Sequence, residues 1–424
     1  MPDLFDNDYK QWNVQVHEWS AVDVFAQNSE IALGIHRIHL GEGPSLDVLV
    51  QGDICSTDWK RLPVFFNGAI AQREDKNGPF FSGRGLAASE GYGFIAISDP
   101  STVLGKSLGL AWYAGNQFSQ LQDAIVQILT TIHKTIGKDL LFIGGSGGGF
   151  AAVLYASLLG EVASAIAWNP QSDILEYNEV DVRNYFQIAF PESARRILEA
   201  EDWKTPMKVA LESHRVRHEL LTLPSRPQNM IVFQNYSDWH VQSHAVPFIK
   251  AWSLRDLGDS IYGDTDGRYV YIANFGEGHV SLPSKPLQVA IQMLGKEGRN
   301  ASTAISQLSS HPELNKGEPE KLPRDLRDSI EALNEEFDLE ISYVSESTIS
   351  VRVQHKSHIH NFGGISYGFF RLDAAGVRTS EAFSRGWARK FQITPSDKKI
   401  GVLIRDGFGN VVAEALREIP PIVR

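Results

Sequence analysis

Short runs of apolar residues alternate with amphipathic stretches along the first 295 residues of the chain. Runs bounded by glycine, proline or asparagine are typical of strands buried on both faces, and they lie at 62–66, 93–97, 140–143, 163–168, 230–234 and 269–273. Residues 117–133 instead repeat their apolar positions every three or four residues, which predicts a helix that buries one face. Strands alternating with helices predict one doubly wound, mostly parallel α/β sheet.

Two segments within residues 1–295 depart from this alternation. The first 60 residues contain strand-like runs broken by turn residues and predict an N-terminal β extension. Residues from about 174 to 228 become charged, with helices expected at 180–198 and 206–221. Because this stretch lies between two predicted strands of the sheet, we expect it to form a helical cap over an active site.

The period of the pattern changes near the C-terminus. Residues 296–337 are predicted to form a linker and a connecting helix, because 295–324 are polar and rich in glycine, serine, proline, lysine and glutamate. From residue 338 onward apolar and polar positions alternate, as in Ile349, Val351 and Val353. Short strands spaced in this way predict a small all-β, immunoglobulin-like sandwich over residues 338–424.

A serine between glycines stands where a predicted strand meets a predicted helix. The segment reads Gly144-Gly145-Ser146-Gly147-Gly148, and an apolar helical pattern follows it. This is the strand–turn–helix context of a nucleophile elbow, in which small residues let strand and helix approach while the serine hydroxyl stands exposed. A phosphate-binding loop is the alternative, but no lysine follows at the spacing of a P-loop. The pattern favours Ser146 as a nucleophile.

A serine nucleophile needs a base and an acid, which in doubly wound hydrolases follow it in the order acid, then histidine. Asp238 follows the predicted strand 230–234, and His279 lies in a glycine-containing loop after 269–273. We therefore predict Asp238 as the acid and His279 as the base. Asp173, after the strand 163–168, is the alternative acid.

Other histidines and the oxyanion hole complete the prediction. His240 and His244 compete with His279, but they lie on the turn expected to carry the acid. The amide of Gly147 is expected to face a developing oxyanion, and Gly68 or Ala69, after the strand 62–66, to supply the second donor. A plain tight turn is the alternative reading of Gly68 and Ala69.

Composition narrows the function classes without choosing among them. The chain has 424 residues and a net charge of −11, which argues against general nucleic-acid binding. From Glu340 to Arg424 there are 12 basic and 8 acidic residues, so this part carries +4 and the rest −15. Cys55 is the only cysteine, so no intrachain disulfide forms. No leader pattern or membrane-length apolar run is seen, and we expect a cytoplasmic protein without a membrane span.

The frame of Ser146, Asp238 and His279 resembles the α/β-hydrolase superfamily over residues 45–295. Three segments are also similar to bacterial proteins of surface-glycan assembly, which include capsule polysaccharide O-acetyltransferases and the glycan O-acetyltransferase of accessory Sec systems: 97–100 with 111–115, 144–152 and 168–171. Segments 367–372 and 404–410 resemble β-sandwich modules of glycan-associated proteins. Asn67-Gly68 replaces the His-Gly common in esterases, which leaves that half of the oxyanion hole open.

The residues and the resemblance together predict serine-dependent acyl transfer, by an esterase or O-acetyltransferase, on a carbohydrate or glycan-linked substrate. The resemblance implies acetyl-CoA as a candidate acyl donor, with no bound cofactor and no metal. A carboxylesterase of small esters, a peptidase, and a non-catalytic scaffold of a glycan-assembly complex are the alternatives. The C-terminal module is expected to contact an extended glycan, including an anionic one, or a partner protein of glycan assembly.

Overall fold

The computed structural model describes residues 7–315, 337–355, 366–384, 387–405 and 411–421. Residues 316–336 of the predicted linker and connecting helix lie outside these residues, and Phe337 begins a strand. Residues 406–410, which contribute to the resemblance of the C-terminal module, also lie outside them.

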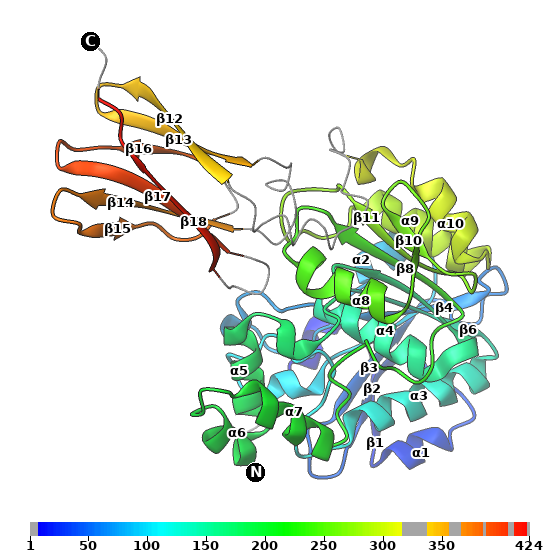
Figure 1. Ribbon diagram of the computed structural model, residues 1–424. Helices are drawn as coiled ribbons and strands as arrows, with labels where there is room; N and C mark the ends of the chain where they lie inside the picture. Colours follow the sequence, from blue (N-terminus) through cyan, green and yellow to red (C-terminus); the bar gives the residue numbers. More distant parts are fainter. Residues whose placement is uncertain (1–6, 316–336, 356–365, 385–386, 406–410, 422–424) are drawn as a thin grey trace.

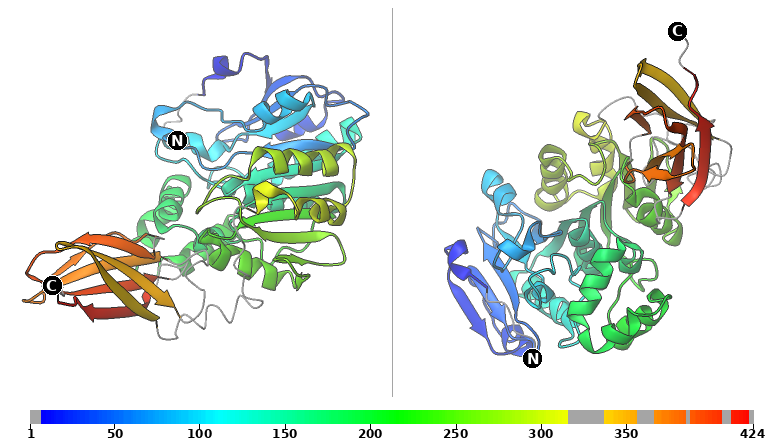
Figure 2. Two further views of the ribbon diagram at one scale, coloured as in Figure 1. Left: turned by 90° about the horizontal axis from the view of Figure 1, so that it is seen from above. Right: turned by 90° about the vertical axis from the view of Figure 1, so that its left-hand side faces the viewer.

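The centre of the molecule is a mostly parallel sheet (Figures 1 and 2). Its described strands, in spatial order, are β1 (Val16–Trp19), β2 (Gly34–Ile38), β3 (Leu46–Gln51), β5 (Phe94–Ile97), β4 (Arg61–Phe66), β6 (Asp139–Gly145), β7 (Ala163–Trp168), β8 (Asn229–Asn235), β11 (Arg268–Ala273), β10 (Ile261–Gly263) and β9 (Arg255–Asp256). The six strands from β5 to β11 all run parallel, while β3 and β10 pair antiparallel on either side of them. The predicted doubly wound sheet is thereby confirmed, in the arrangement typical of α/β-hydrolases.

Helices pack on both faces of this sheet. The α-helices of the described residues are α1 (Val22–Ala26), α2 (Arg84–Glu90), α3 (Leu121–Ile136), α4 (Gly147–Leu159), α5 (Glu179–Ala189), α6 (Pro191–Ile197), α7 (Lys204–Ser213), α8 (Val246–Ala251), α9 (Ser284–Ile291) and α10 (Ala301–Leu308), of which α5, α6 and α7 belong to the segment 174–228. Along β6, Leu140 and Phe142 join the apolar cluster that contains α3 and α4, whereas Leu141 and Ile143 join the cluster that contains α9 and α10. Burial on both faces explains why the strands are continuous apolar runs.

The order of the strands determines where a site can form. From β4 the chain crosses to β5 on one side and then returns to β6 on the other. Crossovers that leave in opposite directions open a crevice at the carboxyl ends of the two strands, which is where ligands bind in doubly wound sheets. The turn after β6 carries Ser146, and the turn after β4 carries Asn67 to Ala69.

The helices of residues 174–228 differ in their bounds from the expectation. The helix expected at 180–198 is divided into α5 and α6, because Pro191 begins a new helix after Phe190. The helix expected at 206–221 ends at Ser213, and Arg215 then takes a left-handed backbone with φ of 59°. Figure 1 shows α5, α6 and α7 gathered at one end of the sheet.

Residues 296–315, which were expected to be linker, are instead part of the folded body. Asn300 caps α10 by accepting a hydrogen bond from the Thr303 amide at 3.0 Å. The buried side of α10 consists of Ala301, Ala304, Ile305 and Leu308, and it packs on β8 and β11. Small alanines alternate with polar residues here, so the apolar face is narrow and the composition resembles that of a linker.

The described part of the C-terminal region forms two antiparallel sheets that stand apart from the large sheet (Figures 1 and 2). One contains β12 (Phe337–Ser345), β13 (Thr348–His355) and β16 (Ala388–Gln392); the other contains β15 (Arg378–Ser380), β14 (Ser366–Asp373), β17 (Asp397–Arg405) and β18 (Val411–Glu418). The sheets pack face to face through Phe369 and Phe391, whose ring centroids are 5.7 Å apart. Separate antiparallel sheets at the C-terminus are therefore confirmed.

No helix within the described residues combines the length and the apolar character needed to cross a bilayer.

Candidate active site

Ser146 occupies a strained turn between β6 and α4. Its backbone has φ of 54° and ψ of −123°. This conformation is unfavourable in free energy for any residue with a side chain, and it persists only where the surrounding structure enforces it. The neighbouring glycines leave no room for a Cβ: one at Gly144 would meet the Gly148 carbonyl, and one at Gly148 would meet the Phe66 carbonyl. Strand, helix and turn can therefore approach this closely only with glycine at both positions.

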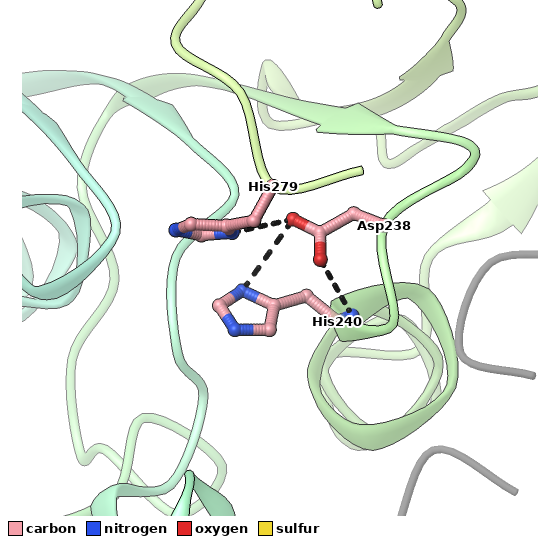
Figure 3. Close-up of side chains that lie close together, drawn as sticks. All are labelled: Asp238, His240 and His279. Carbon is pink, nitrogen blue, oxygen red and sulfur yellow. Dashed lines mark hydrogen bonds and ion pairs between the residues drawn. The ribbon is translucent and has the colours of Figure 1, made fainter. Parts of the chain in front are cut away.

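His279 and Asp238 form a hydrogen-bonded pair at the ends of β11 and β8 (Figure 3). His279 Nδ1 lies 2.6 Å from Asp238 Oδ2, and because a carboxylate only accepts, Nδ1 carries the proton. The Asp238 side chain is fully buried, whereas that of His279 is 32% exposed. The remaining nitrogen of His279, Nε2, is thereby left as an acceptor, as a general base requires.

The surroundings of Asp238 keep it ionised. Burial alone would raise the pKa of this carboxyl, but the neighbouring His240 and the hydrogen bond from His279 outweigh burial and hold the pKa below its ordinary value. The His240 backbone amide also donates to Asp238 Oδ1 at 3.2 Å. An ionised carboxylate at this position stabilises the imidazolium that forms when His279 takes a proton.

The loop that carries His279 is held by two asparagines that the sequence reasoning did not single out. The side-chain amide of Asn235 donates to the backbone carbonyls of Gly276 and Gly278, at 2.8 and 2.6 Å respectively. The side-chain amide of Asn169 donates to the backbone carbonyl of Val280 at 2.8 Å. Both asparagines are buried at the ends of strands, and a polar residue at the end of an apolar run was the signal that could have identified them.

His240 and His244 are buried behind the pair and do not reach the cavity described below. His240 Nδ1 donates to the Asn169 carbonyl at 3.0 Å, and the His240 ring packs on that of His279 at 4.4 Å. Burial lowers the pKa of His240 well below its ordinary value and that of His244 to about 3, so both rings are neutral. They support the site without titrating near neutral pH.

The structure places Asp173 away from this pair. Its Oδ1 accepts from the Leu175 amide at 2.9 Å, where it caps a short helical turn, and from His218 Nδ1 at 3.2 Å. The Asp173 carboxylate therefore has hydrogen-bond partners within its own surroundings, and neither of them is His279.

Two of the three residues expected to form the oxyanion hole, Gly68 and Ala69, line one cavity with Ser146. The cavity has a volume of about 510 Å³, and its walls include Ser146, His279, Gly68 and Ala69 together with Tyr177 from the segment 174–228. Gly147 begins α4, where the first backbone amides have no partner within the helix. The N-terminus of a helix also favours negative charge.

Hydrogen bonds of Tyr113, a residue that the sequence reasoning did not single out for the site, hold the turn Asn67–Ala69. The Asn67 amide donates to Tyr113 Oη at 2.6 Å, and Tyr113 Oη donates to the Ile97 carbonyl at 3.0 Å. The Tyr113 amide in turn donates to the buried Asp99 carboxylate at 2.6 Å. Asp99 lies in 97–100 and Tyr113 in 111–115, so the two stretches that together form one of the resembling segments meet next to the site.

Two groups of described residues have the donor atoms for a metal ion. Asp238, His240 and His279 place ligand atoms within 4.8 Å of one another, and so do Asp173, His218 and Glu219. In the first group His279 Nδ1 is already bonded to Asp238 and His240 Nδ1 to the Asn169 carbonyl. Both Nδ1 atoms are thus already used in hydrogen bonds, which fits a histidine oriented by a carboxylate better than a metal site.

No family model matches the chain, and no curated protein matches it in sequence. Similar solved structures include the capsule O-acetyltransferase of Neisseria meningitidis serogroup A, with 13% identity and a TM-score of 0.37 over 66% of this chain and 94% of that one. An S-formylglutathione hydrolase from Agrobacterium tumefaciens has 13% identity and a TM-score of 0.37, over 67% and 97%. A Pyrococcus horikoshii acylaminoacyl peptidase has 13% identity and a TM-score of 0.36. This match covers 69% of the present chain but only 44% of the length of the peptidase. At this identity and TM-score, no activity of these proteins is transferred to this chain.

Proposed function

We propose that this protein is a serine-dependent acyl-transfer enzyme, an esterase or O-acetyltransferase, that acts on a carbohydrate or glycan-linked substrate. One observation carries the proposal: a serine on a strained elbow shares a cavity with a histidine whose other nitrogen is bonded to a buried carboxylate. Such an arrangement supports nucleophilic catalysis through an acyl-enzyme.

In the first half-reaction, Ser146 Oγ attacks the acyl carbonyl of the donor, and His279 Nε2 takes the hydroxyl proton. Asp238 stabilises the resulting imidazolium through the 2.6 Å hydrogen bond. The tetrahedral oxyanion accepts from the amide of Gly147 and from that of Gly68 or Ala69. When the intermediate collapses, the leaving alcohol or thiol takes the proton from His279, and the acyl group remains on Ser146.

In the second half-reaction an acceptor hydroxyl attacks the acyl-enzyme. His279 takes the proton of that hydroxyl, and the tetrahedral intermediate then expels Ser146 Oγ, which recovers the proton. Water as acceptor makes the protein an esterase, and a sugar hydroxyl makes it an O-acyltransferase. Competition between the two depends on how well a bound acceptor excludes water from the cavity.

The glycan substrate is proposed from the sequence resemblance and from where the resembling residues lie. Asp99, Trp112, Tyr113 and Gln171 all come from segments similar to glycan O-acetyltransferases, and they form hydrogen bonds that lead to Ser146 or to the Asn67 turn. The resemblance therefore concerns the surroundings of the nucleophile. We propose acetyl-CoA as the acyl donor to test first. We also propose that residues 338–424 form an immunoglobulin-like module that contacts the polymer or a partner protein.

Covalent labelling with a fluorophosphonate tests the proposal. The unaltered chain is expected to be labelled on Ser146, as located by mass spectrometry of the peptides, and Ser146→Ala is expected to escape labelling. Ser157→Ala is the matched control, because Ser157 lies on the same helix with its hydroxyl bonded to the Val153 carbonyl. An unaltered chain that takes no label and hydrolyses no p-nitrophenyl acetate would support the non-catalytic scaffold instead.

The choice between hydrolysis and transfer needs an acceptor. Acetate release from p-nitrophenyl acetate or acetyl-CoA is measured with and without a neutral oligosaccharide, and acetylated sugar is detected by mass spectrometry. A transferase forms the sugar ester at the expense of free acetate. An esterase forms free acetate at the same rate in both mixtures.

A further inference from the structure

A buried glutamine, Gln171, lies against the nucleophile. It follows β7 in the sequence Asn169-Pro170-Gln171, and its side chain is fully buried. Gln171 Nε2 lies 3.1 Å from Ser146 Oγ and 3.5 Å from His240 Nε2, while Trp112 Nε1 lies 3.0 Å from Gln171 Oε1. Gln171 therefore connects a tryptophan, a second histidine and the nucleophile.

The chemistry of its neighbours determines which way the amide of Gln171 points. An indole N–H only donates, so the oxygen of the amide faces Trp112. At the other end, His240 Nδ1 faces the Asn169 carbonyl, which only accepts, so Nδ1 carries the proton of this neutral ring. His240 Nε2 is then an acceptor and takes a hydrogen from the Gln171 amide. Both neighbours independently turn the NH₂ group toward Ser146.

This orientation has a consequence for the serine hydroxyl. A hydroxyl has one hydrogen to donate and lone pairs to accept with, and Gln171 occupies a lone pair of Ser146 Oγ. The Ser146 hydrogen is therefore directed away from Gln171. His279 lines the same cavity as Ser146 and is the base that the proposed function assigns to this hydrogen. A donor aimed at Oγ also stabilises negative charge on that atom, and it does so inside a buried environment where such interactions are strong.

We propose that Gln171 is a catalytic residue that donates to Ser146 Oγ when this atom carries negative charge, and that Trp112 and His240 are positioning residues that act through it. The inference rests on the proposed function. Charge develops on Oγ twice: when His279 removes its proton during acylation, and when Oγ leaves the acyl group during deacylation. The hydrogen bond makes and breaks no covalent bond, and the proton path through His279 is unchanged.

Gln171→Met is the first test, because methionine has a similar length and no donor. Hydrogen bonds to charged groups contribute about 1.5–3 kcal/mol, so we expect the rates of fluorophosphonate labelling and of p-nitrophenyl acetate turnover to fall about 10- to 100-fold. Gln122→Met is the matched control. Gln122 is also buried and makes two hydrogen bonds, to the Arg217 backbone at 3.0 Å each, but on α3 away from the site.

Gln171→Glu separates hydrogen-bond donation from packing. An ionised glutamate accepts the Ser146 hydrogen instead of donating to Oγ, whereas a protonated one regains a donor. We therefore expect the turnover of Gln171→Glu, relative to the unaltered chain at the same pH, to be lowest at high pH and to rise as the pH falls. A glutamine that only fills space would give a constant ratio across the pH range.

Trp112→Phe tests the orientation of the amide, and it decides the question if Gln171→Met does not fold. Without the indole donor the amide can turn its oxygen to Ser146, so labelling should slow, by less than in Gln171→Met. The inference is overturned if the unaltered chain is labelled on Ser146 and the folded variants at positions 171 and 112 are labelled within about twofold of it. An unaltered chain without label on Ser146 overturns the proposed function as well.

Discussion

Asp238 and Asp173 follow neighbouring strands of one sheet, but their hydrogen bonds differ. Asp238 accepts from the imidazole of His279, whereas Asp173 accepts from a backbone amide and from His218. We predict that Asp238→Asn lowers the kcat for a small ester by about 10⁴, because an amide no longer stabilises the imidazolium or holds the correct tautomer of the ring. Steady-state kinetics with p-nitrophenyl acetate measure this loss, and a thermal melt checks that the variant is folded.

Asp173→Asn is the matched comparison. We expect its kcat to remain within about twofold of the unaltered chain, with a loss of stability below about 1 kcal/mol, because asparagine caps a helical turn about as well as aspartate does. The reverse result, with Asp173→Asn inactive and Asp238→Asn active, would move the acid to the end of β7 and leave Ser146 and His279 in their roles.

Asp99 is a buried carboxyl whose ionisation should affect stability. Burial, opposed by hydrogen bonds from the Tyr113 and Ser101 amides, raises its pKa from 3.8 to about 6. Between these values the folded state holds the proton more tightly than the unfolded state does, so the contribution of Asp99 to the free energy of unfolding falls as the pH rises from about 4 to 6. We predict that Asp99→Asn loses this dependence.

Urea unfolding at pH 4.5 and pH 6.5 measures the effect. The stability of the unaltered chain minus that of Asp99→Asn should decrease by about 1–3 kcal/mol between the two pH values. Taking the difference between variants removes the contributions of the other titrating groups. A difference that is constant, or that increases with pH, would contradict the prediction.

At the scale of the elements, the turn between β4 and α2 depends on one phenol. Tyr113 Oη accepts from the Asn67 amide and donates to the Ile97 carbonyl, which ties the turn to the end of β5. We predict that Tyr113→Phe lowers kcat about tenfold, because the turn proposed to supply the second oxyanion donor becomes less ordered. KM for a small ester should change less than kcat, since the binding walls of the cavity remain.

Tyr185→Phe is the control for Tyr113→Phe. Tyr185 is also fully buried, and its hydroxyl donates to the Gly115 carbonyl at 2.9 Å without touching the Asn67 turn. The two variants should lose similar stability, but only Tyr113→Phe should lose turnover. Equal kinetics in both variants would show that the phenol of Tyr113 does not act on the site.

At the scale of the whole molecule, the residues after α10 are hydrogen-bonded to β11 and to the start of the loop that carries His279. The Asn274 amide donates to the Leu314 carbonyl at 2.9 Å, and Tyr271 Oη donates to Asn315 Oδ1 at 3.2 Å. Residues 310–315 therefore support the segment that leads from β11 to His279. The folded body that contains the candidate site extends at least to Asn315, and not to residue 295 as expected from composition.

Two truncations test this boundary. A chain ending at Asn315 should keep its small-ester turnover within about threefold of the full chain, and should lose more of its activity on a polymer. A chain ending at Gly298 lacks α10 and the contacts of Leu314, so it should have a lower Tm and at least about tenfold lower turnover. If the chain ending at Asn315 is folded but inactive on the small ester, the C-terminal sheets complete the active site.

The sequence alone was enough to predict the parallel sheet, the helix α3 and the elbow. Each of these depends on local rules: strands buried on both faces are continuous apolar runs, α3 repeats its apolar positions with the helical period, and a turn as tight as that at Ser146 requires glycine at positions 144 and 148. The order of Ser146, Asp238 and His279 along the chain could be found for the same reason, because each follows a strand. The two-residue period of Ile349 to Val353 likewise indicated the C-terminal sheets.

Only the tertiary structure decided which side chains meet. Asp173 and Asp238 have the same relation to their strands in sequence, and their difference arises because β11 brings His279 next to β8. The same holds for Gln171, whose role depends on the positions of Trp112 and Ser146, 59 and 25 residues away in the chain. The narrow buried face of α10 also becomes apolar surface only where β8 and β11 lie beneath it. Periodicity reports which face of an element is buried, whereas a hydrogen bond between distant residues depends on how the elements pack.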